Sequence, residues 1–290
     1  MKKTKRLHRG GGLLCVNSPG VRILNGSVVL LWSVIIILPL VMVFFMSFKT
    51  NTEVGYSGIF SPPQSFLNLD NYLTFISRSK IFQAYKNTFI LIFCSVPVSL
   101  LLAAMASYVL DRFDFLGKKL ISALFTCAVM IPNITTQIVI FKMIQSLGVY
   151  NTRWAGVILF TAVDIVQIYM FRQFVRNVPR ELDESAMIDG AGVPAIFFRI
   201  VLPQLVPAFA TTAILKALSI YNDMFIAYLY MPDTAFRTVS QSIRLFTNDY
   251  GGQWNVISAG VMLIMLPTLL VYLFTQRWIV NDLTGGAVKG

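Results

Sequence analysis

Long runs of hydrophobic residues, separated by short polar segments, dominate this chain. Six of the runs are close to the ~20 residues that a helix needs to cross the ~30 Å hydrocarbon core of a bilayer. They cover residues 28–48, 87–110, 120–141, 154–171, 206–231 and 256–277. The pattern predicts an all-α, polytopic membrane protein with six transmembrane helices, because helices satisfy their own backbone hydrogen bonds in lipid.

Prolines and polar segments refine this plan. Pro39, Pro97 and Pro267 fall inside spans, which membrane helices tolerate, whereas Pro132 followed by Asn133 predicts a break in the third span. The turn-rich segment 49–86 is expected to form an extracytoplasmic loop.

Composition agrees with a membrane protein. Of the 290 residues, 56% are hydrophobic and only 13% are charged, with a mean hydropathy of +0.69, whereas a soluble domain has about 25% charged residues. The net charge of +11 is therefore assigned to basic cytoplasmic segments rather than to nucleic-acid binding.

The distribution of lysine and arginine predicts the orientation. With the N-terminus inside, 15 of the 24 basic residues fall in cytoplasmic segments and eight in outer segments. This count predicts a basic cytoplasmic tail (1–27), a six-span domain (28–277) with a cytoplasmic loop at 172–205, and a cytoplasmic tail (278–290). A signal peptide is the alternative for the basic start, but no small-residue cleavage site follows Phe48.

Catalytic and metal chemistry has little support in the sequence. The three cysteines, Cys15, Cys94 and Cys127, show no metal-ligand spacing, and His8 is the one histidine. No G-x-x-x-x-G-K-[ST] nucleotide-binding loop is present. We therefore expect no catalytic residues, no metal site and no cofactor bound by this chain.

The most polar long stretch between spans runs from Glu181 to Pro203 and reads as helix, tight turn, helix. Acidic residues begin it, where a helix dipole favours them, and Gly190 permits a left-handed turn. Pro194 is suited to the first turn of a second helix, which Pro203 is expected to end.

The spacing within this stretch resembles the EAA loop of the membrane subunits of binding-protein-dependent ABC importers. The matching residues are Glu184, Ser185, Ala186, Gly190, Ile200, Leu202 and Pro203, with Ser185 where the family has alanine. The resemblance implies a cytoplasmic coupling helix that docks on an ATPase, in which Glu184 pairs with a basic group, Ala186 packs closely and Gly190 turns. Asp189 and Gly192 are included as neighbours. The alternative is a solvated helical hairpin between spans.

The end of the chain, with Asp282 where the family usually has glycine, resembles the G-L-T-x-G-A-V-K-G ending of maltose-type carbohydrate permeases. The alternative is a flexible polar end. The resemblance implies the ABC importer type I permease fold in a bacterial or archaeal cytoplasmic (inner) membrane, similar to the second of two permeases. It implies as partners a second permease, an ATP-binding subunit dimer that holds ATP-Mg, an extracytoplasmic solute-binding protein, membrane lipid and a sugar substrate, and no nucleic acid.

Three ionisable residues fall within the apolar runs, namely Asp164, Lys216 and Asp223. An isolated charge costs about 2.5–3.5 kcal/mol at the centre of a membrane helix, so each is expected to face protein or water. Asp164 and Lys216 either form a buried ion pair or flank the translocation path.

The segment Tyr221-Asn222-Asp223 resembles the W-N-D/E-F segment of carbohydrate permeases. An aromatic face stacks on a sugar ring and the polar groups bind its hydroxyls, so these residues are candidates for the substrate path. An interfacial aromatic cluster with a polar helix–helix contact is the alternative.

Together these features predict a permease subunit of an ATP-driven sugar or oligosaccharide importer. Because the EAA loop is shared across importer classes, a non-sugar solute stays open. An ion-coupled secondary transporter that uses Asp164 and Lys216 as a relay is the alternative from another class.

Overall fold

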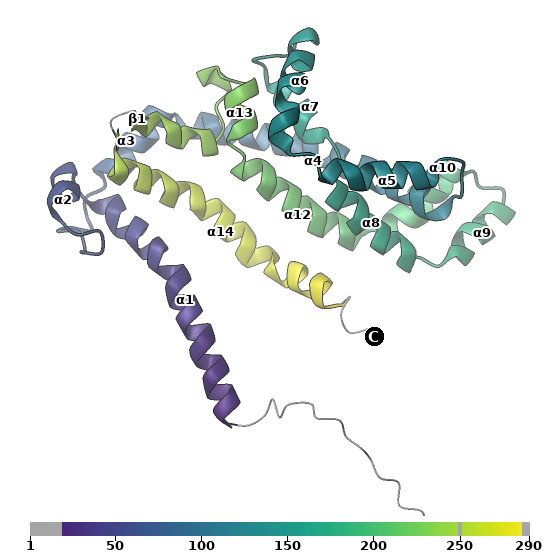
Figure 1. Cartoon of the computed structure of the whole chain (residues 1–290), viewed down its shortest axis with the longest axis horizontal. Helices are drawn as coiled ribbons and strands as arrows, with labels where there is room; N and C mark the ends of the chain where they lie inside the picture. The colour runs from purple at the N-terminus through teal and green to yellow at the C-terminus, as the bar shows by residue number, and fades with distance from the viewer. Residues whose placement is uncertain (1–18, 249–250, 286–290) are drawn as a thin grey trace, which may run out of the picture.

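The computed structural model describes residues 19–248 and 251–285, which form an almost entirely helical structure (Figure 1). The longest helices are α1 (Pro19–Phe48), α4 (Ile81–Arg112), α12 (Val206–Asn222) and α14 (Trp254–Gly285). The shorter α-helices are α2 (Asn51–Tyr56), α3 (Asp70–Ser79), α5 (Lys118–Val129), α6 (Asn133–Ser146), α7 (Arg153–Thr161), α8 (Ile165–Asn177), α9 (Arg180–Ile188), α10 (Val193–Ile196), α11 (Leu202–Gln204) and α13 (Phe225–Tyr230). The remaining elements are a π-helix, η1 (Phe197–Val201), two 3-10 segments, η2 (Thr234–Phe236) and η3 (Ser240–Phe246), and an antiparallel pair of two-residue strands, β1 (Thr247–Asn248) and β2 (Gly251–Gly252).

The membrane-spanning pattern combines continuous and broken helices. Three helices, α1, α4 and α14, are long and apolar enough to cross a bilayer alone. Three further segments reach that length only as bent pairs: α5 with α6 (107°), α7 with α8 (45°), and Val193–Gln204 with α12 (75°). Counting each bent pair as one span gives up to six, in agreement with the all-helical six-span prediction.

Helix α4 organises the packing. It lies against α7, α8 and α12, while α14 packs on α1, α3 and α12 (Figure 1). Serines on α4 bond directly to its neighbours: Ser95 Oγ donates to Val157 O (3.1 Å) and Ser107 Oγ to Ile168 O (2.9 Å). Small residues of this kind let membrane helices approach closely without leaving polar groups unpaired.

The segment after α1 differs from the loop predicted for residues 49–86. It contains α2 and α3, and α4 begins six residues earlier than expected, at Ile81. The fully buried Lys49 fixes the first part of this segment, because its Nζ donates to Ser57 Oγ (2.9 Å), Gly58 O (2.9 Å) and Ser61 Oγ (3.0 Å). Buried charges of this kind require such partners.

Two predicted spans contain an interruption that hydropathy did not predict. The fourth, expected at 154–171, breaks at 162–164, and the fifth, expected at 206–231, breaks at Asp223–Met224. At the first break the Ala162 carbonyl accepts Lys216 Nζ (3.2 Å) and Ser99 Oγ (3.3 Å), and at the second Asp223 Oδ1 accepts the Ile226 N–H (2.8 Å). Side chains thus satisfy the backbone groups that the breaks release. The break predicted at Pro132 is confirmed.

The terminal helices also extend beyond the predicted spans. Helix α1 begins at Pro19 rather than Val28, and α14 continues to Gly285 rather than ending at Arg277. The rest of the predicted tails, residues 1–18 and 286–290, lies outside the described residues, as do the side chains of residues 277–285.

Replacing Gly260 with alanine is expected to lower the free energy of unfolding by about 1–3 kcal/mol, because an added Cβ on α14 would lie 2.2–2.6 Å from the ring of the buried Phe75 on α3. The matched control is Gly26→Ala in α1, where nothing lies within 4 Å of the new Cβ. The control is expected to be neutral or slightly stabilising. Thermal unfolding of both variants in detergent checks this, and equal unfolding temperatures would contradict it.

Candidate functional site: a polar cavity and a docking loop

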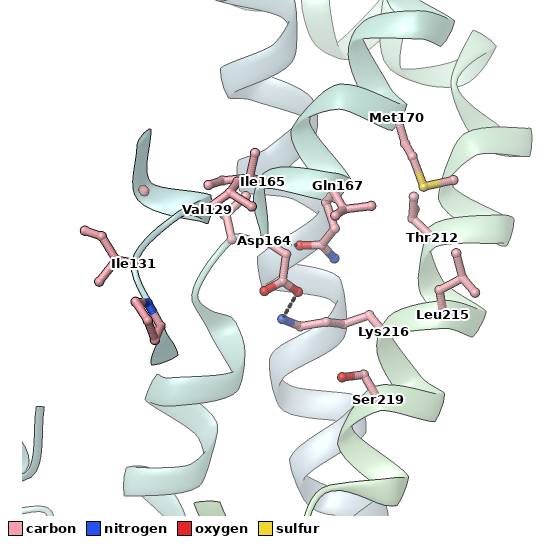
Figure 2. A pocket seen from close by; sticks show the side chains of 14 residues that line it. Val129, Ile131, Asp164, Ile165, Gln167, Met170, Thr212, Leu215, Lys216 and Ser219 are labelled. Carbon is pink, nitrogen blue, oxygen red and sulfur yellow. Dashed lines mark hydrogen bonds and ion pairs between the residues drawn. The ribbon is translucent and has the colours of Figure 1, made fainter. Parts of the chain in front are cut away.

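A cavity of about 690 Å³ lies where the broken helices meet (Figure 2). Its wall comes from the α5–α6 and α7–α8 breaks, the start of α8 and one face of α12. Most of the lining is apolar, and the polar side chains that reach it are Asp164, Gln167, Thr212, Lys216 and Ser219.

Asp164 and Lys216 form the ion pair that was one of the two predicted arrangements, and both also line the cavity. Lys216 Nζ lies 2.7 Å from Asp164 Oδ2 (Figure 2). The lysine side chain is only 7% exposed, whereas the Asp164 side chain is 57% exposed and opens to the cavity. Lys216 therefore depends on its partner for solvation, while Asp164 has access to water or solute.

Gln167, which the sequence interpretation missed, completes this corner of the cavity. Its Oε1 accepts the Asp164 N–H (3.0 Å) and the Ser99 hydroxyl (3.1 Å), which fixes the amide. Its Nε2 is buried without a hydrogen-bond partner in the described part of the chain, and the side chain lines the cavity. Such a donor is suited to a solute oxygen. The sequence feature that could have identified Gln167 is its position three residues after Asp164, in the first turn of α8.

The residues predicted to line the substrate path lie on two different faces of α12. Thr212, Lys216 and Ser219 line the polar cavity, whereas Tyr221 lies on the opposite face, in an apolar groove of about 300 Å³ against α4 and α14. The Tyr221 side chain is buried and its hydroxyl donates to Ile264 O (2.8 Å). The structure thus does not bring Tyr221 together with Asp164 and Lys216.

Its neighbours have different positions. Asn222 is exposed and lies one turn beyond Ser219, so it continues the cavity-lining face of α12 toward α13. Asp223 is half-buried at the end of α12 and binds the backbone of α13. Of the predicted triplet, only Asn222 shares the face of α12 that carries Ser219, and its side chain makes no hydrogen bond to another described residue.

The second site is the loop at 180–204, whose helix–turn–helix form agrees with the sequence prediction. Helix α9 ends in a turn in which the Ala191 N–H donates to Ala186 O (2.9 Å) and Gly190 takes a positive φ of 83°. That conformation strongly favours glycine. Pro194 lies in the first turn of α10, as predicted.

The loop presents its motif residues on two faces. Glu184, Ser185, Asp189, Gly190 and Gly192 are exposed, whereas Ala186 is buried. Large apolar side chains are exposed beside the polar ones, and we call this set the docking face: Leu182, Met187, Ile188, Val193 and Phe198. Ile188 is the most exposed of the five, at 86%.

The second half of the loop departs from prediction at one point. Pro203 was expected to end the helix, but helical backbone continues to Gln204 and the chain turns at Leu205. The π-helix η1 precedes this proline, which lies in the first turn of α11, where its missing N–H costs little. Ile200 and Leu202 are half-buried beneath the loop.

A buried ion pair, which sequence reasoning missed, fixes α9 to the end of α4. Arg112 Nε lies 2.9 Å from Asp183 Oδ2, with side chains only 5% and 6% exposed. Arg112 Nη2 also donates to Val178 O (2.6 Å). Burial raises the pKa of the Asp183 carboxyl, and the Arg112 guanidinium opposes this shift. The loop is therefore rigidly attached to a long helix that also contacts the cavity wall.

Metal and redox groups have no visible site in the described part of the chain. No group of three or more histidine, cysteine or acidic side chains is placed to bind a metal ion among these residues, and Cys94 and Cys127 are free thiols.

The fold and the two sites define a class: a polytopic membrane protein with broken spans around a cavity and a rigid, exposed loop at one end of the spans. The chain belongs to the family described as "Binding-protein-dependent transport system inner membrane component", which it matches over residues 21–285. The family assignment from the EAA-type loop is thereby confirmed.

Two curated relatives and one solved structure illustrate this similarity. The chain is 31% identical over 263 residues to the "Probable starch degradation products transport system permease protein AmyC" of Thermoanaerobacterium thermosulfurigenes, covering 90% of this chain and 93% of the relative. It is 30% identical over 260 residues to the "Arabinooligosaccharides transport system permease protein AraQ" of Halalkalibacterium halodurans, covering 88% and 92%. Its fold matches a chain of a bacterial ABC transporter involved in alginate import, with a TM-score of 0.76 at 19% identity over 90% of this chain and 98% of that chain.

Proposed function

We propose that this chain is one of two different membrane subunits of an ATP-driven importer for a sugar or oligosaccharide. The observation that carries the proposal is the rigid docking loop, in which Glu184, Ser185 and Gly190 of the EAA-type motif are exposed together with the docking face at one end of the spans. The names of the relatives, which refer to oligosaccharides and starch degradation products, support the carbohydrate class.

In this mechanism the loop contacts the ATPase and the cavity binds the solute. The loop at 180–204 lies in the cytoplasm, with both chain termini on the same side, and docks on an ATP-binding subunit dimer that holds ATP-Mg. Closure of that dimer pulls on α9, and the Arg112–Asp183 pair transfers the movement to α4. The spans then open outward and accept sugar from an extracytoplasmic solute-binding protein. ATP acts by stabilising one of two states of the complex.

The cavity offers groups that suit a polyhydroxylated solute. The unpaired Nε2 of Gln167 donates, the exposed Asp164 carboxylate accepts, and Ser219, with Asn222 one turn further along α12, adds polar contacts. The remainder of the wall is apolar, as is usual where a few polar groups orient a ligand. Glu184, Ser185 and Asp189 are proposed as the polar contacts to the ATPase, and Gly190 and Gly192 as the residues that shape the turn beside them.

The test is purification of the chain from its own cells in mild detergent after cross-linking, with mass spectrometry of its companions. We expect an ATP-binding subunit, a second permease and a solute-binding protein. The purified complex in vesicles is then expected to take up labelled oligosaccharides only with ATP inside. Recovery of this chain alone, under conditions that preserve other membrane complexes, would overturn the proposal. ATP-driven uptake of a non-sugar solute alone would overturn its carbohydrate part.

A further inference from the structure

A basic pocket lies far from both sites described above. Its volume is about 260 Å³, and it is formed by the junction of α3 and α4 together with the η2 segment and the residues beside it. Three cationic side chains, Arg78, Lys80 and Arg237, line it. None of the four ion pairs between described residues involves these three side chains.

The electrostatics of the pocket call for an anion. Three like charges repel one another around a small volume, and burial lowers the pKa of the half-buried Arg237 guanidinium. Asp233, the acidic residue beside the η2 turn, already uses its carboxylate to cap the Ala235 N–H (2.8 Å). Arg78 and Lys80 are exposed and Arg237 is half-buried, so water solvates the three like charges in part, and a bound anion would relieve the repulsion that remains.

Two further features point into the same pocket. The Ser79 hydroxyl lines it and is buried without a hydrogen-bond partner in the described residues. The first turn of the 32-residue helix α4 also begins here, with no acidic residue in that turn and no side-chain cap. The positive end of a helix dipole favours an anion and disfavours Lys80, which occupies the cap position.

The pocket is rigid before any ligand arrives. Asn87 Nδ2 donates to Ala235 O (2.8 Å) and Arg237 O (2.9 Å), while Gln83 Nε2 donates to Ala235 O (3.2 Å). Arg153 Nε in turn donates to Asn87 Oδ1 (3.1 Å). These bonds fix the backbone on both sides of the cationic groups, so binding would cost little ordering.

The position along α4 identifies which side of the membrane the pocket faces. The opposite end of this helix carries Arg112, which anchors the docking loop, and 31 residue steps of 1.5 Å separate the two ends by about 45 Å. That distance exceeds the ~30 Å hydrocarbon core, so the pocket lies at the outer surface if the loop is cytoplasmic. Ser99, which bonds Gln167 at the cavity, is about 27 Å from the start of α4, so the pocket and the cavity are separate sites.

We propose that this pocket, formed by Arg78, Ser79, Lys80 and Arg237, binds an acidic side chain of the solute-binding protein when it docks on the outer face. The inference rests on the proposed importer function. A carboxylate accepts two charge-assisted hydrogen bonds from a guanidinium and a third from the serine hydroxyl, and the volume fits a side chain rather than an oligosaccharide.

The experiment measures the affinity of the purified binding protein for the complete complex in lipid nanodiscs, across a range of NaCl concentrations. The variant is Arg78→Gln with Arg237→Gln. The matched control is Lys86→Gln, an exposed cation near the start of α4 that does not line the pocket. We expect the double variant to raise the Kd about tenfold or more and to flatten its salt dependence, while the control stays within about twofold of wild type.

Each outcome is decisive once the unfolding temperature has confirmed that the variant complex is assembled. An unchanged Kd and salt dependence in the double variant would overturn the docking site but leave the importer function intact. Unchanged docking with reduced uptake of a carboxylated sugar, relative to a neutral one, would assign the pocket to substrate and also overturn the proposal. Failure of the wild-type complex to bind any solute-binding protein would instead overturn the importer function itself.

Discussion

Replacing Asp183 with alanine is expected to reduce ATP-driven uptake by tenfold or more. The change leaves the Arg112 guanidinium buried with no carboxylate partner, and breaking a buried pair from one side costs about 3–5 kcal/mol. The cheapest relaxation is to move α9 away from α4, which frees Arg112 to reach water. A loop that is no longer attached to α4 still docks on its ATPase but transmits little movement to the spans.

The measurement compares uptake with ATP hydrolysis in reconstituted vesicles. In the Asp183→Ala complex we expect hydrolysis to persist while uptake falls. The matched control is Asp114→Ala, which removes an ion pair with Lys118. Because the Asp114 carboxylate is 96% exposed, this change should leave uptake unchanged. Equal losses of uptake in both variants would contradict a coupling role for the buried pair.

An apolar replacement of both partners separates the ion pair from its packing. Arg112→Met with Asp183→Leu removes both charges together, so neither is left unpaired. Such replacements are often neutral or stabilising in buried sites. We expect the double variant to recover more uptake than Asp183→Ala, and a double variant worse than the single one would show that the charges themselves are needed.

The docking loop was the feature most open to prediction from sequence, because its signals are local. Gly190 supplies a positive φ and Pro194 starts a helix, and neither effect depends on distant contacts. Asp183 carries no such signal. Its partner Arg112 is 71 positions away in the sequence, so only the packing of α9 on α4 shows that the carboxylate is buried.

The breaks within the fourth and fifth spans could not be predicted from the sequence. Hydrophobic residues continue on both sides of 162–164 and of Asp223, so hydropathy indicates one uninterrupted helix in each case. Each break is stable because a side chain binds the released backbone, as Lys216 does for Ala162 O. Pro132 was recognisable since it lacks a backbone N–H and cannot continue a helix unaided.

Tyr221 shows why proximity in sequence misleads about function. Its resemblance to an aromatic sugar contact was plausible, but its place on the helix follows from spacing: it is five residues from Lys216 and therefore points away from it. Asn222 and Ser219 are three residues apart and share the polar face.

The two members of the cavity pair are expected to respond unequally to mutation. Asp164→Ala leaves the Lys216 side chain, which is only 7% exposed, without its carboxylate, so that the Ala162 carbonyl is its one remaining partner among the described residues, and should cost about 3–5 kcal/mol. Lys216→Met leaves the Asp164 carboxylate in the open cavity, where water solvates it, and should cost about 1 kcal/mol. Thermal unfolding of each variant complex measures the difference.

The exchange of the two charges tests direct pairing. In Asp164→Lys with Lys216→Asp the ion pair can re-form across the 2.7 Å contact, so the double variant should be more stable than Asp164→Ala and retain more uptake than either reversed single variant. A double variant no better than the single reversals would exclude pairing as the source of stability. Equal losses of stability in Asp164→Ala and Lys216→Met would instead mean that the carboxylate and the ammonium depend on each other to the same extent. The cavity would then be closed to water in the resting state, and the carboxylate would not be free to accept a hydrogen bond from solute.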